Sequence, residues 1–423
     1  MALAQPIPPS DDYHLSLLEM GVPSVIAFHA SLPATTPLHD LSILNLERVA
    51  LHLLNKYPLL RCSIARTPGQ RACLLMQPDM HPSAVVAERR DATEMKASEH
   101  LARMLNEVEI DWEQGPLWRV WSCSSTSNGK PAIVLGIAHL ISDGVGARAL
   151  FSDLLHLLRN YPTCPPPPSY EFPPVRDDMQ CFLPPKEKVT EFQREMNKLG
   201  PVKPPPPIIP STVGAPDSAK YTETRQLGSF SASAIAKLKS AGRKHAVRSL
   251  HPILQTAALV AISLVYVKDS QSEFDINSHT DVSLRDPKLG HPRATGSFAI
   301  GMGTKRYVCT TSDCHFWRIC RMYQQDLRDQ DEMKETCWGL GFDWGRGEGN
   351  EGGYSLDQRM ERDEQRKTLA GGWSWQSTAS TSNLGVMERT GWEGELKDVC
   401  WAQTARDGSD AFPINVSPTR RAR

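Results

Sequence analysis

Apolar and polar residues alternate over short stretches and recur at three- and four-residue spacing over longer ones. The first 160 residues are therefore predicted to mix strands and helices. The strand-like stretches are 22–30, 59–65, 71–76, 116–123 and 131–138. The helix-like stretches are 38–56, a segment near 99–109, and 144–160. Thr36 and Asp40 are candidate caps for the first of these helices. These elements predict a mixed α/β half.

Proline marks the clearest internal boundary. Fifteen of the 33 prolines lie between Tyr161 and Pro210, where they exclude central strands and favour a stiff, extended crossing segment. A helix is predicted inside this segment, over Lys186–Leu199. After this segment, strand-like and helix-like stretches follow one another again. Strands are predicted at 221–229, 274–284 and 297–304, and helices at 231–245, 250–267 and 316–328. We therefore expect three parts, residues 1–161, 162–215 and 216–423.

Charge and cysteine content narrow the function classes. Lysine plus arginine (47) nearly equals aspartate plus glutamate (48), so the chain has no basic excess. This balance argues against a nucleic-acid-binding protein and against a polybasic membrane-surface protein. The longest apolar run, near Thr256–Val267, is too short to cross a bilayer, and the amino terminus does not have a signal-peptide pattern. Ten cysteines without tight spacing indicate reduced thiols. Together these features predict a soluble, cytoplasmic protein.

One short motif carries recognisable chemistry. His139–Gly144 (HLISDG) lies where a predicted strand meets a predicted helix. A neutral imidazole at such a junction can remove a proton from a hydroxyl or an amine, which accelerates a reaction by about 10²–10⁴-fold. Asp143 can turn its carboxylate back into the structure, and Gly144 permits a tight bend before the helix. From the residues alone, a half-buried core histidine followed by an aspartate helix cap explains the motif equally well.

The motif resembles the HxxxDG signature of the chloramphenicol-acetyltransferase-like superfamily. That family includes CoA-dependent acyltransferases, fungal alcohol acetyltransferases, polyketide-associated acyltransferases and peptide-synthetase condensation domains. Four more stretches resemble the family in the same order: the opening DDYHLSLLEMG and VIAFHASL, which are similar to its first strand region; Tyr57–Arg61 (YPLLR); Asp281–Arg285 with Thr295–Phe298; and Ser382–Gly385 (SNLG). A single histidine, preceded by Ala138, favours free-standing acyltransferases over condensation domains.

The resemblance implies a fold of two similar mixed α/β domains with a tunnel between them. Acyl-CoA would enter from one face as a co-substrate, and a small-molecule acceptor from the other; no permanently bound cofactor and no metal are implied. His139 would act as the general base, and the acceptor would attack the thioester directly. Asp143, next to Gly144, would be structural and paired with Arg285 of the second half. The implied candidates for the substrate tunnel are Ser297, Ser382, Asn383 and Gly385.

Several stretches depart from this picture. Residues 345–367 are charged and glycine-rich, a composition typical of disorder. Gly347–Gly352 spells GxGxxG there, but no apolar strand precedes it, so it indicates a polar loop. The resemblance implies a longer segment after the SNLG turn than residues 386–423 supply. The shorter segment would leave part of the tunnel floor missing. Four clustered residues without CxxC spacing indicate buried thiols more than a metal site: Cys309, Cys314, His315 and Cys320.

Three hypotheses about function remain. The leading one is a CoA-dependent acyltransferase, an alcohol O-acetyltransferase that moves an acetyl or acyl group to a small alcohol or a secondary-metabolite hydroxyl. The second is a catalytically degenerate family member that acts as a binding protein. The third is a condensation module of the peptide-synthetase type. The acceptor, the acyl chain length and the oligomeric state stay open at this point.

Overall fold

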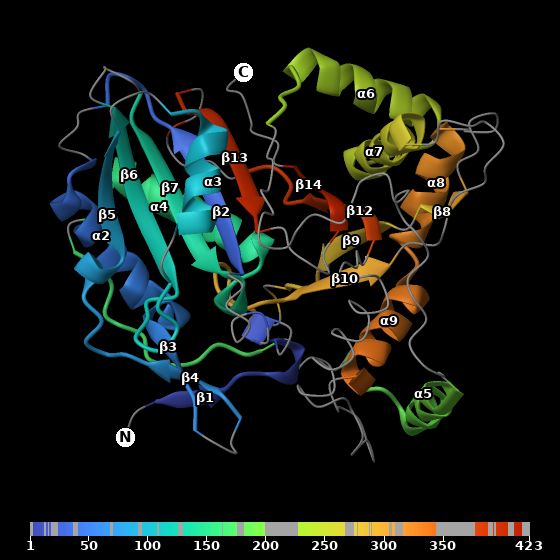
Figure 1. The fold of residues 1–423 in the computed structure, drawn as a ribbon, viewed down its shortest axis with the longest axis horizontal. Coiled ribbons are helices and arrows are strands. Elements are labelled where there is room, and N and C mark those ends of the chain that lie inside the picture. Colours follow the sequence, from blue (N-terminus) through green and yellow to red (C-terminus); the bar gives the residue numbers. More distant parts are fainter. Residues whose placement is uncertain are drawn as a thin grey trace.

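The chain folds into two lobes, each built on a mixed sheet with helices packed against it (Figure 1). In this computed structural model the described residues are 3–11, 14–15, 17, 24–36, 41–67, 71–91, 95–107, 110–125, 130–162, 164–175, 182–198, 227–266, 275–276, 278–286, 288, 290–303, 307–308, 316–343, 377–387, 392, 395–404 and 410–416.

The sheet of the first lobe has five strands in the order β13-β2-β7-β6-β5. Only the β5–β6 pair in it is parallel. Its strands are β13 (Lys397–Gln403), β2 (Val25–Ser31), β7 (Ala132–Ala138), β6 (Trp118–Ser125) and β5 (Val86–Asp91). The helices of this lobe are α2 (Ile43–Lys56), α3 (Ala97–Glu107) and α4 (Gly144–Arg159).

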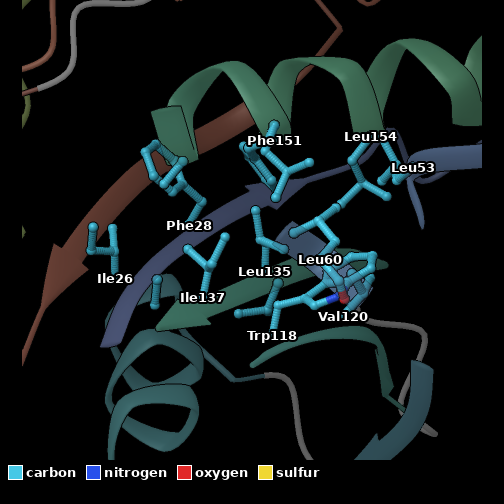
Figure 2. Packing of buried hydrophobic residues seen from close by; sticks show 14 of the residues in the cluster. Ile26, Phe28, Leu53, Leu60, Trp118, Val120, Leu135, Ile137, Phe151 and Leu154 are labelled. Atoms are coloured by element: carbon cyan, nitrogen blue, oxygen red, sulfur yellow. The ribbon is translucent and has the colours of Figure 1, made fainter. Parts of the chain in front are cut away.

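Helices cover both faces of this sheet. Phe28 on β2 packs against Phe151 on α4, with ring centroids 5.3 Å apart (Figure 2). The next residue, His29, contacts His100 on α3 instead. Successive residues of a strand point to opposite faces, so α4 and α3 lie on opposite sides of the sheet. This double cover explains why all seven residues of β7 are buried and why its sequence is a continuous apolar run.

The sheet of the second lobe has the order β10-β9-β12-β14. Helices α7 and α8 pack together beside it, and α9 packs against both α5 and β10. Its strands are β9 (Ser278–Ser283), β10 (Ala299–Gly303), β12 (Ser377–Asn383) and β14 (Asp410–Val416). The helices are α5 (Lys186–Lys198), α6 (Ala232–Lys244), α7 (Leu250–Tyr266), α8 (Phe316–Asp326) and α9 (Gln330–Asp343).

Smaller elements complete the two lobes. A three-stranded sheet has the order β1 (Ala4–Pro6), β4 (Cys73–Met76), β3 (Cys62–Ala65). A two-stranded sheet pairs β11 (Tyr307–Val308) with β8 (Asp275–Ile276). The short 3-10 helices are η1 (Pro9–Asp11), η3 (Pro58–Arg61), η4 (Pro82–Ala84) and η5 (His139–Ile141). Within the described residues, no helix has both the length and the apolar character that a bilayer crossing requires.

The mixed α/β fold predicted from the sequence is confirmed, and most predicted elements form within a few residues of their expected bounds. The cap of α2 was predicted wrongly: Ser42 accepts the hydrogen bond from the Asn45 amide, at 3.4 Å. No strand forms at 227–229, and the rest of the strand predicted over 221–229 lies outside the described residues. Of the two opening stretches, the first contains helical residues at 14–15 and 17, and the second, VIAFHASL, contains the predicted strand as β2.

The end of the chain belongs to both lobes. After the SNLG turn, β13 pairs antiparallel with β2 of the first lobe, and β14 pairs parallel with β12 of the second. The residues after that turn therefore supply a strand to each sheet. The segment 345–367 lies outside the described residues, and the three-part division of the chain stays a prediction.

Candidate functional site

The HLISDG motif lies at the end of a central strand of the first lobe. β7 ends at Ala138, η5 begins at His139, and Asp143 caps the amino terminus of α4. The strand is held in the core on both faces, and the helix is anchored by its apolar side. The junction between them therefore has a fixed position, and it lies at the strand–helix boundary that the sequence predicts.

His139 is half-buried and is held through its backbone and its ring. Its amide donates a hydrogen bond to the carbonyl oxygen of Ser24, at 2.7 Å. Its imidazole is stacked on the ring of His14, with centroids 4.1 Å apart and an interplanar angle of 15°. Nothing in the sequence pattern marks His14 or Ser24 as part of this site.

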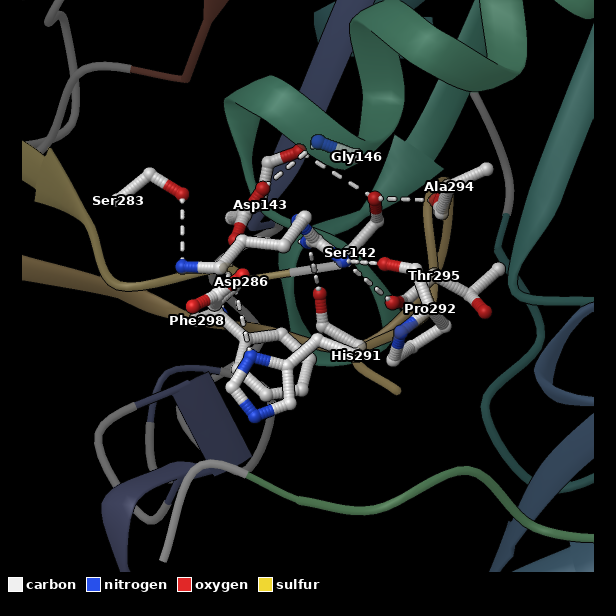
Figure 3. Close-up of polar contacts among 12 residues, drawn as sticks. Ser142, Asp143, Gly146, Ser283, Asp286, His291, Pro292, Ala294, Thr295 and Phe298 are labelled. Carbon is white, nitrogen blue, oxygen red and sulfur yellow. Dashed lines mark hydrogen bonds and ion pairs between the residues drawn. The ribbon is translucent and has the colours of Figure 1, made fainter. Parts of the chain in front are cut away.

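Asp143 is completely buried, with 0% of its surface exposed. Its Oδ1 accepts the amide hydrogen of Gly146 at 2.7 Å, which caps α4. Its Oδ2 accepts one hydrogen bond from Arg285 Nη2 at 2.9 Å and one from the Phe298 amide at 2.8 Å (Figure 3). The helix-cap interpretation and the Arg285 pairing are thus both correct, because the two carboxylate oxygens divide these tasks.

Arg285 is enclosed by the second lobe around this ion pair, with 6% of its side chain exposed. Its guanidinium donates to the carbonyl oxygens of Pro292, of Thr295 at 3.0 Å and of Gly296 at 2.8 Å. It also lies over the Phe298 ring, 4.8 Å from the centroid. Five donors in a planar fork suit this set of acceptors, which a lysine would not satisfy.

His291 completes the aromatic side of this cluster. Its ring stacks on Phe298 with centroids 4.6 Å apart, and its Nδ1 accepts the amide hydrogen of Asp286 at 2.9 Å. Burial, together with the neighbouring Arg285 cation, lowers the pKa of His291 below its ordinary value. His291 is thereby favoured in its neutral form next to the arginine.

Backbone hydrogen bonds join the two lobes at the same place. Ser142 and Gly296 form a parallel bridge, and the Gly296 amide donates to the Ile141 carbonyl oxygen at 2.8 Å. The Ser142 hydroxyl donates to the Ala294 carbonyl oxygen at 3.0 Å. The turn Thr295–Phe298 of the second lobe is therefore clamped onto the HLISDG loop, and Ser297 is buried within that turn.

The SNLG turn lies against the start of α4. Arg148 on that helix donates to the carbonyl oxygen of Leu384 and, at 3.2 Å, to that of Val386. Inside the turn the Gly385 amide donates to Asn383 Oδ1 at 3.0 Å, and Gly385 has a φ of +69°, which favours glycine. Ser382 is buried at the end of β12. The tunnel role predicted for these residues and for Ser297 stays a prediction.

The reason for a glycine at 144 differs from the predicted one. Gly144 does not adopt a left-handed backbone conformation. A Cβ added to it would come within 2.7 Å of Leu384 Cδ2. Gly144 therefore packs closely against the Leu384 side chain of the SNLG turn, and its backbone does not need the conformational freedom of glycine.

The other sequence candidates are not brought into this site. Cys320 is buried on α8, whereas Cys309, Cys314, His315 and the GxGxxG stretch lie outside the described residues. Among the residues that the structure describes, no group of three or more histidine, cysteine, aspartate or glutamate side chains is arranged to hold a metal ion.

The arrangement of lobes and loop can be compared with known proteins. No protein-family model and no curated protein sequence matches the chain. Solved structures do: the epimerization domain from the third module of tyrocidine synthetase B superposes with a TM-score of 0.59 at 13% identity, over 99% of this chain and 89% of that one. The condensation domain from Monacolin K polyketide synthase MokA gives 0.57 at 12% identity, over 95% and 86%. The chain has the condensation-domain fold.

Polyketide synthase associated protein 5 from Mycobacterium tuberculosis has the same fold, with a TM-score of 0.53 at 12% identity over 81% of this chain and 78% of that one. The condensation-domain fold comprises two related lobes, as the resemblance of the sequence implied. At these identities the similarity establishes architecture only.

Proposed function

We propose that the chain is an acyltransferase that moves an acyl group from a thioester to a hydroxyl or an amine, with His139 as the general base. The observation that carries the proposal is the buried contact between Asp143 and Arg285, at 2.9 Å, which fixes the loop of one lobe against the other beside His139. A buried ion pair with additional hydrogen bonds on both partners holds a single arrangement of the loop.

The proposed reaction needs no covalent intermediate on the protein. An imidazole nitrogen of His139 accepts the acceptor's proton while the acceptor's oxygen or nitrogen attacks the thioester carbonyl carbon. The tetrahedral adduct then collapses, the carbon–sulfur bond breaks, and the imidazolium returns the proton to the departing thiolate. The products are an ester or an amide and a free thiol, and His139 is neutral again.

Asp143 has a structural role in this proposal. Its oxygens are directed to the Gly146 amide, the Phe298 amide and Arg285, that is, towards α4 and the second lobe. It therefore differs from the aspartate of a Ser-His-Asp triad, which bonds the catalytic imidazole. Loss of Asp143 should act on activity through the position of the loop.

The thioester donor separates two versions of the function. Acyl-CoA, bound as a co-substrate, is the donor expected from the resemblance of the sequence to free-standing acyltransferases, and a small-molecule hydroxyl would be the acceptor. A carrier-protein thioester is the second candidate, supported by the similarity to the epimerization and condensation domains. Both donors present a thioester to His139 by the same chemistry.

The test measures thiol release from acetyl-CoA with a panel of small alcohols and amines, and acyl transfer from a phosphopantetheinylated carrier domain. Turnover with the wild-type chain that falls about 10²-fold or more in folded His139→Ala supports the proposal. The exposed His156 provides the matched control, since His156→Ala should retain wild-type activity. Turnover that survives in His139→Ala refutes the base, and no turnover with either donor favours the degenerate binding protein.

A further inference from the structure

A second histidine covers the face of the proposed base. The rings of His14 and His139 lie nearly parallel, 4.1 Å apart between centroids. His14 Nδ1 lies 3.0 Å from the hydroxyl of Ser24, and the carbonyl oxygen of the same serine accepts the His139 amide at 2.7 Å. Ser24 is buried, so its position is fixed by the fold. One serine thus anchors both the backbone of His139 and the ring stacked on it.

The imidazole of a histidine needs such support because its terminal torsion is broad. Rotation about χ2 has no narrow staggered wells, so the ring plane is not fixed by the rotamer alone. A flat partner at van der Waals distance removes this freedom, since tilting either ring would force atoms of the two rings together. Asp143 directs its carboxylate towards Gly146 and Arg285, so it does not orient the imidazole of His139. The ring of His14 lies flat against that imidazole and is placed to hold its plane.

We propose that His14 is a positioning residue for His139: its stacked ring, anchored to Ser24, holds the imidazole plane so that a nitrogen meets the acceptor's proton in line. This inference rests on the proposed acyl transfer. Misplacement of a reacting group by about 1 Å can cost about 10²-fold in rate, so the orientation of the ring should be reflected in kcat.

The decisive comparison is between His14→Phe and His14→Leu. Both lose the contact with the Ser24 hydroxyl, but only phenylalanine keeps a flat ring against His139. We expect His14→Phe to stay within about threefold of the wild-type kcat and His14→Leu to fall at least about tenfold, with KM for donor and acceptor within about threefold in both. His156→Leu, at an exposed position on α4, is the matched control and should leave kcat unchanged.

A measurement independent of activity keeps the stack testable. In protein labelled with ¹³C at histidine Cε1, the His139 resonance, assigned through its loss in His139→Ala, should carry a ring-current shift from His14. That shift should disappear in His14→Leu and persist in His14→Phe. If the His139 resonance is the same in all three proteins, the rings do not stack and the inference is overturned.

The outcomes separate the inference from the function on which it rests. An active wild type with His14→Leu as active as the wild type overturns positioning while leaving the acyltransferase intact. Equal losses of kcat in His14→Phe and His14→Leu also overturn it, because the flat ring would then not matter. An inactive wild type with an intact His14 ring-current shift overturns the proposed function, and the stack is then only structural.

Discussion

Removal of either partner of the Asp143–Arg285 pair should destabilise the protein much more than the exposed ion pairs do. In Asp143→Ala, the buried Arg285 loses its anion but keeps the carbonyl oxygens of Pro292, Thr295 and Gly296. In Arg285→Ala, the completely buried Asp143 keeps two amide donors but loses its only charged partner among the described contacts. Each single change leaves an uncompensated buried charge, so each should cost about 3–5 kcal/mol.

The double variant removes both charges but not every cost. Asp143→Ala also removes the cap of α4, worth about 1 kcal/mol, and the acceptor of the Phe298 amide, worth about 1–3 kcal/mol. These losses remain in the double variant, so it should not be neutral. Its loss in free energy of unfolding should still be smaller than the sum of the two single losses by about 2–3 kcal/mol, because neither charge is left without its partner.

The assay is the free energy of unfolding from urea titrations of the wild type, both single variants and the double variant. Arg159 and Glu395 supply the matched control cycle: they form an arginine–carboxylate pair at 3.1 Å, but each is 42% exposed. Their coupling should be below about 1 kcal/mol. If Asp143 and Arg285 are additive within about 0.5 kcal/mol, like the control, the two residues do not support the site together and the reasoning fails.

Acid should destabilise the first lobe, because burial lowers the pKa of His29 from 6.5 to about 4. Between these pH values the unfolded chain binds a proton that the folded chain does not, so the free energy of unfolding falls as the pH drops. The shift corresponds to about 3 kcal/mol, and urea titrations at pH 7 and 4 should show a smaller loss in His29→Gln. Gly146→Ala should cost at least about 2 kcal/mol and lower kcat, since the new Cβ would lie 2.6 Å from Ser142 Oγ and 2.9 Å from Arg285 Nη2; a wild-type Tm would contradict this. Arg148→Met should lower the Tm through its lost bonds to the SNLG turn, whereas an unchanged Tm would show that this turn is held elsewhere.

The local elements of this protein follow from its sequence because their causes are local. The apolar run of β7 and the spacing of apolar residues in α4 predict both elements within a residue of their bounds. The HLISDG motif also identifies the strand–helix junction, and its resemblance to known acyltransferases identifies Arg285 as the partner of Asp143. Helix α9 was missed because its residues, rich in charge and glycine, show little apolar periodicity.

Only the tertiary structure decides which distant segments meet. No periodicity could show that β13, near the end of the chain, pairs with β2 near its beginning, because strand pairing depends on the path of the chain between them. The stack of His14 on His139 and the donation from the Phe298 amide to Asp143 likewise join residues that are more than 100 positions apart. The sequence by itself determined the base candidate and its charged support. The packing of the two lobes determined how that support is built, because buried polar groups are satisfied by whatever backbone the fold brings beside them.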